Sequence, residues 1–208
     1  MTSPESPVDP AIPALHATPV LRPVPELRPV HGWPRLEDGR LRQFLRHWAA
    51  SRGDGLVAKR SAIDPAELKP CLPYLWIYRW QPERQDFYCS LAGEAVNDAW
   101  GRSIRNRFLS EIMEPDNADL LRLRYRLVIE TPSIQISRRP IQPHLHLGKD
   151  SERLITPLAD DAGRVFGVFG MTLYHYDRVT EADKPIHPRR EVEAYACADL
   201  PRDLPGLD

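Results

Sequence analysis

Apolar side chains recur at helical spacing near the start of the ordered part of the chain. They stand three or four residues apart, with charged and polar side chains between them: Leu41, Phe44, Leu45 and Trp48. This spacing predicts an amphipathic helix over 36–51, and the run Gly53-Asp54-Gly55 predicts where it ends.

Further along, the pattern predicts two strands, three helices and three more strands. Segments that are aromatic, β-branched or alternating predict strands at 74–80, 86–92, 133–137, 153–158 and 164–176. Helical periodicity predicts helices at 94–100, 108–113 and 116–130. The expected order is therefore one helix, two strands, three helices and three strands.

Both ends of the chain are rich in proline. Residues 1–34 hold a proline every few positions, and proline breaks helices and removes a strand donor, so we expect a disordered Pro-rich tail. Residues 177–208 are expected to be mostly irregular, with a short helix near 191–198. One folded domain with its N-terminal helix is expected over 35–176.

Whole-chain composition narrows the partners and the compartment. The formal net charge of the 208 residues is −1 and no apolar run is long enough to span a bilayer, so we expect neither nucleic acid nor a membrane as partner. No secretory signal pattern opens the chain, and three widely spaced cysteines indicate reduced thiols, so a cytoplasmic location is expected. The 24 arginines against 4 lysines, with 22 prolines, indicate a GC-rich bacterial genome.

Three local phrases resemble a family of short single-domain bacterial PAS proteins. They are Leu72-Pro73-Tyr74-Leu75, Ser90-Leu91-Ala92-Gly93 and the segment 152–158, within a resemblance that covers 36–176. The resemblance implies an α+β fold: a five-stranded antiparallel sheet with helices on one face, preceded by the amphipathic helix. It also implies a sensory domain that encloses a small ligand between sheet and helices.

The residues that could line such a pocket are the apolar and aromatic ones of the predicted strands and helices. They are Ile77, Cys89, Leu91, Trp100, Leu109, Ile112, Tyr125, Leu127, Ile155, Phe169 and Met171. A simply filled core would contain the same residues. Tyr78, Tyr88 and Tyr125 are the candidates to orient a ligand, because a buried phenol needs a hydrogen-bond partner.

Known cofactor signatures of PAS relatives are missing. Haem-binding relatives place a histidine on the long helix, but 116–130 contains none, and the Asn-Cys-Arg-Phe run of flavin photosensors is absent, so haem and flavin are both disfavoured. His144 and His146 share one face of an extended segment, but no cysteine or carboxylate stands at ligand spacing, so we expect loop histidines and no metal. The identity of the ligand stays open.

Two predicted strands, 74–80 and 164–176, are apolar on both faces. The three central helices cover one face, so the 36–51 helix must cover the other, from its own chain or from a second subunit. We predict a homodimer through this helix and the outer sheet face. The interface candidates are Leu41, Phe44, Leu45, Trp48, Trp76 and Tyr78.

No nucleophile triad, P-loop or dinucleotide fingerprint occurs in the sequence, and no kinase, cyclase, phosphodiesterase or helix-turn-helix segment fits the tails. An enzyme that uses Asp98 and Tyr88 is disfavoured, because nothing in the sequence places these two residues close together. We therefore predict a non-catalytic sensory or regulatory module of bacterial signal transduction, which binds a small apolar metabolite or a protein partner and acts through association. The alternative is a pure protein-interaction scaffold with a filled core and no ligand.

Overall fold

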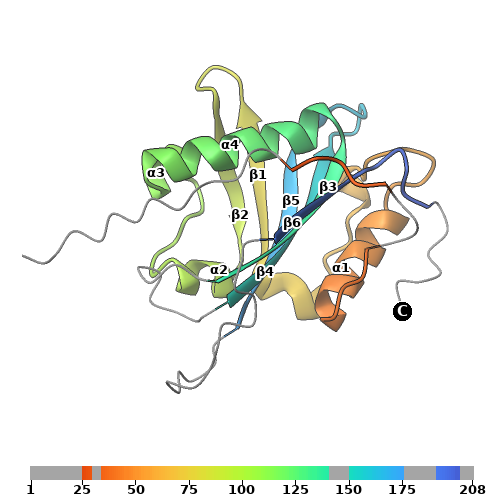
Figure 1. Ribbon diagram of the computed structural model, residues 1–208, viewed down its shortest axis with the longest axis horizontal. Helices are drawn as coiled ribbons and strands as arrows, with labels where there is room; N and C mark the ends of the chain where they lie inside the picture. Colours follow the sequence, from red (N-terminus) through yellow and green to blue (C-terminus); the bar gives the residue numbers. More distant parts are fainter. Residues whose placement is uncertain (1–24, 30–33, 141–149, 176–190, 202–208) are drawn as a thin grey trace, which may run out of the picture.

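A single six-stranded antiparallel sheet organises the part of the chain that the computed structural model describes, residues 25–29, 34–140, 150–175 and 191–201. Its strand order is β2-β1-β5-β4-β3-β6 (Figure 1). The strands are β1 (Leu75–Gln81), β2 (Asp86–Ala92), β3 (Ser133–Pro140), β4 (Asp150–Ala159), β5 (Val165–His175) and β6 (Glu191–Ala196).

Helices pack on both faces of this sheet. They are α1 (Gly39–Ala50), α2 (Glu94–Ala99), α3 (Leu109–Ile112) and α4 (Pro115–Glu130), with 3-10 turns η1 (Arg60–Ala62) and η2 (Lys69–Tyr74). Figure 1 shows the longest, α4, crossing the strands. Among the described helices, none has the length and apolar character needed to cross a bilayer.

The sheet has one strand more than the sequence predicted. The expected short helix near 191–198 is wrong: Glu191–Ala196 forms β6, which pairs with β3 along its length. A six-residue segment is too short for its own periodicity to decide between helix and strand, and here the free edge of β3 decides. The sheet ladder thus extends beyond the domain expected from the sequence.

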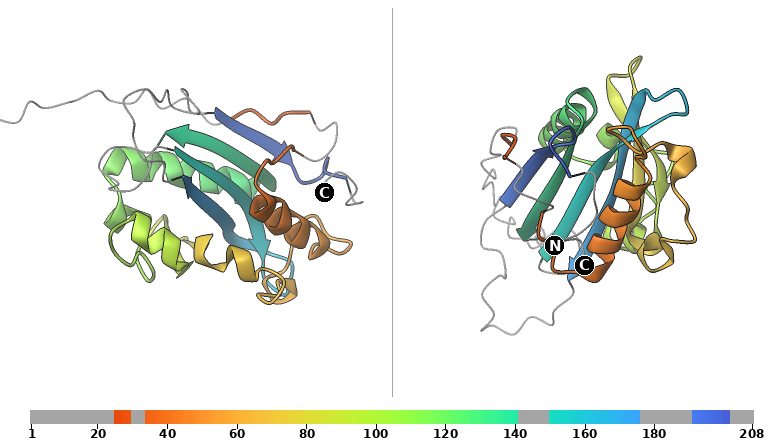
Figure 2. Two further views of the ribbon diagram at one scale, coloured as in Figure 1. Left: turned by 90° about the horizontal axis from the view of Figure 1, so that it is seen from below. Right: turned by 90° about the vertical axis from the view of Figure 1, so that its right-hand side faces the viewer.

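Part of the predicted Pro-rich tail also pairs with this edge. Leu27 forms a parallel bridge with Ala194, and the Arg28 amide donates to the Ala194 carbonyl at 2.8 Å. The Arg28 guanidinium pairs with Glu193 at 2.6 Å. Residues 25–29 therefore lie beside β6 and occupy the edge of the sheet (Figure 2), so the expectation of a wholly disordered tail is corrected at these residues.

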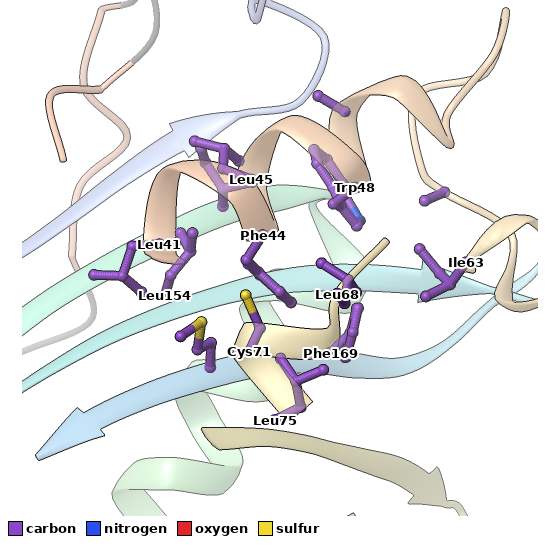
Figure 3. Packing of buried hydrophobic residues seen from close by; sticks show 14 of the residues in the cluster. Leu41, Phe44, Leu45, Trp48, Ile63, Leu68, Cys71, Leu75, Leu154 and Phe169 are labelled. Carbon is purple, nitrogen blue, oxygen red and sulfur yellow. The ribbon is translucent and has the colours of Figure 1, made fainter. Parts of the chain in front are cut away.

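Helix α1 covers one face of its own sheet. Asp38 begins it, since its carboxylate accepts the Arg40 amide at 2.8 Å. The apolar stripe of the helix points at the sheet (Figure 3), where Phe44 meets the Phe169 ring edge-on at 4.7 Å. The indole of Trp48 donates to the Pro157 carbonyl at 2.9 Å, which ties α1 to β4.

This packing corrects the predicted dimer interface. Each of the six candidate side chains is buried within the single chain, with an exposed fraction between 0% and 3%: Leu41, Phe44, Leu45, Trp48, Trp76 and Tyr78. The first four lie on the side of α1 that faces the sheet, and strand alternation turns the last two toward the opposite face of the sheet. The cover of the outer face comes from the chain itself, so these residues are not available to a second subunit.

Helices α2, α3 and α4 cover the opposite face and enclose a second core. Its largest members are aromatic or β-branched side chains: Trp76, Tyr78, Phe87, Tyr125 and Ile104. Gly170 of β5 makes room for one of them, because a Cβ atom there would lie 2.2 Å from the Trp76 indole. The absence of a side chain at position 170 thus lets the indole lie flat across β5.

Candidate functional site

A narrow cleft opens in the second core, between the sheet and its helices. Strands β1, β4 and β5 form the floor with Trp76, Tyr78, Arg153, Thr172 and Tyr174. The walls come from α2, α4 and the segments beside them, through Val96, Trp100, Ile104, Met113, Leu121 and Tyr125. The free volume inside this cleft is about 10 Å³, which is room for roughly one water molecule.

Three aromatic rings form the centre of the cleft. The rings of Trp76 and Tyr125 stack at 5.5 Å with 22° between their planes. Tyr78 lies 5.6 Å from both of them. Because stacked and edge-on rings hold one another in a defined geometry, this cluster forms a preformed apolar floor and wall.

A buried cation lies against these rings. Arg153 is 8% exposed, and its guanidinium lies 5.8 Å from the Trp76 ring centroid. The Thr172 hydroxyl accepts from Arg153 Nε at 3.1 Å and from Trp76 Nε1 at 2.9 Å. Thr172 therefore links the cation and the indole, and Arg153 is the one charged side chain of the described cleft lining.

The neighbouring acidic groups stay neutral near pH 7. Burial raises the pKa of the Tyr78 phenol well above its usual 10, and the nearby Cys89 adds to the shift. Burial likewise raises the pKa of the Cys89 thiol to about 11. Both groups are protonated far above physiological pH, so this thiol is not a ready nucleophile and the charge of the cleft is that of Arg153.

The eleven pocket residues predicted from sequence separate into groups. Trp100 and Tyr125 line the cleft. Cys89, Leu109, Ile112 and Ile155 belong to the same core behind it. Ile77, Phe169, Met171 and Leu91 lie on the α1 side. Leu127 is half-buried on α4.

Strand alternation explains why some of these residues do not line the cleft. On β1, Trp76 and Tyr78 turn toward α4, which sends Ile77 to the α1 face. On β5 the same alternation places Phe169 and Met171 under α1. Of the predicted ligand-orienting tyrosines, Tyr78 and Tyr125 lie in the cleft, whereas Tyr88 donates to Asn106 at 3.1 Å on the exposed side.

Arg153 and Thr172 are functional candidates that sequence reasoning missed. The signal was present: Arg153 alternates with Ile155 on one face of its strand, so a charge stands where an apolar residue is expected. His144 and His146 lie outside the described residues, and within the described ranges no three His, Cys, Asp or Glu side chains gather as a metal site would require.

Family comparison agrees with this architecture. The sequence profile described as a PAS domain matches residues 37–173, about two thirds of the chain. The chain belongs to the PAS domain family. None of the curated proteins is significantly similar to it in sequence.

Solved structures of similar fold include those of VqmA from Vibrio cholerae. One, of the VqmA dimer without its target DNA, shares 20% identity with a TM-score of 0.43 over 54% of this chain and 52% of that one. Another, of VqmA bound to DPO, shares 20% identity with a TM-score of 0.41 over 54% of this chain and 57% of that one. This PAS protein thus spans about half the length of those chains.

These neighbours correct the expectation that nucleic acid is excluded as a partner. A third structure, of a VqmA–ligand–DNA complex, shares 19% identity at a TM-score of 0.39 over 53% of this chain and 49% of that one. The exclusion relied on a net charge near zero, which averages over the whole chain and does not describe any one surface. DNA binding is a property of VqmA. The net charge of the present chain does not by itself exclude nucleic acid as a partner.

Proposed function

We propose that this PAS protein is a non-catalytic sensory or regulatory module that binds a small molecule in the cleft between α4 and the sheet. The family supports a sensory role. The observation that carries the ligand proposal is the convergence of a buried cation, a shared hydroxyl and stacked rings on one cleft. Such a mixture of apolar walls with a few convergent polar groups is typical of small-molecule sites.

Binding requires the cleft to widen. Its free volume of about 10 Å³ is far smaller than a metabolite. Trp100 and Met113 are only half-buried at its rim, and Gly101, with a φ of 61°, follows Trp100 directly. Rotation of these two rim side chains would admit a ligand while the strands stay in place. A protein partner that contacts the rim would then meet a different surface when the ligand is bound.

The second candidate function is a protein-interaction domain with a filled core. The small free volume of the cleft favours it, since a core without room needs no ligand. The two functions differ in one observable, the presence of a bound small molecule.

Native mass spectrometry of freshly purified protein tests the proposal. We expect a reproducible mass beyond that of the polypeptide, which denaturation removes. Leu121→Phe, which adds bulk inside the cleft, is expected to lose this mass, and Leu123→Phe on the exposed side of the same helix is expected to keep it. The polypeptide mass alone in the folded wild type would support the filled-core domain instead.

A further inference from the structure

Arg153 is a buried charge that has no counter-ion among the residues that the structure describes. Transfer of a cation out of water is costly unless an anion compensates it. Within the described part of the chain no carboxylate forms an ion pair with Arg153, and its cross-strand neighbours are the hydroxyl residues Ser137 and Thr172. The side chain is more than nine-tenths buried and lines the cleft.

The adjacent position of the same two strands shows what a satisfied pair looks like here. Glu152 is 7% exposed and lies opposite Arg138, whose Nε donates to its carboxylate at 3.0 Å. That pair occupies the other face of the sheet. One residue further along β4, Arg153 turns into the cleft, where no acid of the described ranges forms an ion pair with it. A guanidinium has five N–H donors, and the Thr172 hydroxyl accepts from one of them.

The surroundings of Arg153 define what an additional partner must look like. The Trp76 and Tyr125 rings and the Val96 and Leu121 side chains offer planar and apolar contact. Tyr78 is neutral, so the cleft carries a single positive charge. A ligand that matches this arrangement has one anionic group and a flat or apolar body.

We infer that the ligand of this cleft is a small monocarboxylic acid with an aromatic or otherwise planar body. Its carboxylate accepts from the terminal guanidinium N–H groups of Arg153, and its ring lies against Trp76 and Tyr125. Arg153 then gains the counter-ion that the described residues do not supply, and Thr172 holds the guanidinium in position. This inference rests on the proposed function and adds the chemical class of the ligand.

The wild-type protein tests this class without any substitution. Calorimetric titration measures the affinity of benzoate, phenylacetate and indole-3-acetate and of the neutral amide of each. Each acid and its amide have nearly the same shape, so a difference in affinity reports the effect of the charge. We expect at least one acid to bind about tenfold to a hundredfold more tightly than its amide, the range that a charged hydrogen-bonded pair provides. Equal affinities for acid and amide would overturn the inference and leave the proposed function standing.

Substitution of Arg153 supplies the second arm. Arg153→Gln is expected to remove the preference for the acid while keeping the weak binding of the amide, and Arg153→Lys to restore part of it, because lysine keeps the charge but loses the planar fork. Circular dichroism verifies that each variant is folded. Unchanged acid binding by folded Arg153→Gln would also overturn the inference, whereas a bound mass that proves to be a neutral molecule would overturn it and support the proposed function. No binding of any probe together with no bound mass would overturn both.

Discussion

Replacing Trp48 by alanine is expected to lower the free energy of unfolding by about 3–5 kcal/mol, the usual cost of removing a large buried aromatic side chain. Trp48 is fully buried between α1 and the sheet, and its indole donates to the Pro157 carbonyl at 2.9 Å. The substitution leaves a cavity and an unsatisfied buried carbonyl at the same place. Urea unfolding followed by circular dichroism measures the loss, and the melting temperature should fall by roughly 10 °C.

Two controls separate the contributions at this position. Trp48→Phe keeps most of the ring packing and loses the hydrogen bond, so it should cost only about 1–3 kcal/mol. Trp80→Ala makes the same deletion at a half-buried site at the end of β1 and should cost clearly less than Trp48→Ala. A near-neutral Trp48→Ala would mean that α1 does not pack on its own sheet, and the covered outer face would then need a second subunit.

Gly170→Ala is expected to disturb the cleft and to destabilise the protein by about 2–3 kcal/mol, as overpacking of a filled core does. An added Cβ would lie 2.2 Å from Trp76 Cζ2, so the indole must leave its place above β5. Its bond to Thr172 and its contact with Arg153 would then be lost together. Near-ultraviolet circular dichroism, which reports on fixed tryptophan environments, should lose intensity, and urea unfolding gives the energy.

Gly39→Ala is the matched control for this substitution. Gly39 opens α1, and its added Cβ would approach only the end of the Arg42 side chain, at 3.7 Å. Alanine favours a helix over glycine, so this variant should be as stable as the wild type or slightly more stable. Equal stability of Gly170→Ala and Gly39→Ala would contradict the described position of the Trp76 indole.

Much of the fold was predictable from local patterns. Alternation and aromatic content predicted segment 86–92 as a strand, which is the extent of β2, and helical spacing around Trp48 predicted a helix where α1 lies. The apolar character of both faces of β1 correctly required a cover on each side of the sheet. These features depend on side chains close together in sequence, so local reasoning reaches them.

The remainder depends on contacts between distant segments. The sixth strand forms because β3 has a free edge, and nothing in Glu191–Ala196 alone decides between helix and strand. The dimer prediction chose the correct apolar residues on α1 but placed Trp76 and Tyr78 on the wrong face of β1. It also could not tell whether α1 covers its own sheet or a neighbour's, since both arrangements place Phe44 and Trp48 in the same environment. The pairing register of the strands decides which of the predicted core residues line the cleft. A shift of β1 by one residue would turn Ile77 toward the cleft in place of Trp76 and Tyr78.

The most direct test of the central claim compares two tryptophans on opposite faces of the sheet. The indole N–H of Trp76 lies in the cleft, whereas that of Trp48 lies between α1 and the sheet. Their resonances in a ¹H–¹⁵N correlation spectrum therefore report on the two cores separately. Phenylalanine variants of each of the five tryptophans assign these signals. On titration with the aromatic acids, their amides and a pool of common metabolites, we predict a saturable shift of the Trp76 resonance with the Trp48 resonance unmoved. A Trp76 resonance that no compound moves, or one that moves only together with Trp48, would contradict the claim that the cleft is a ligand site.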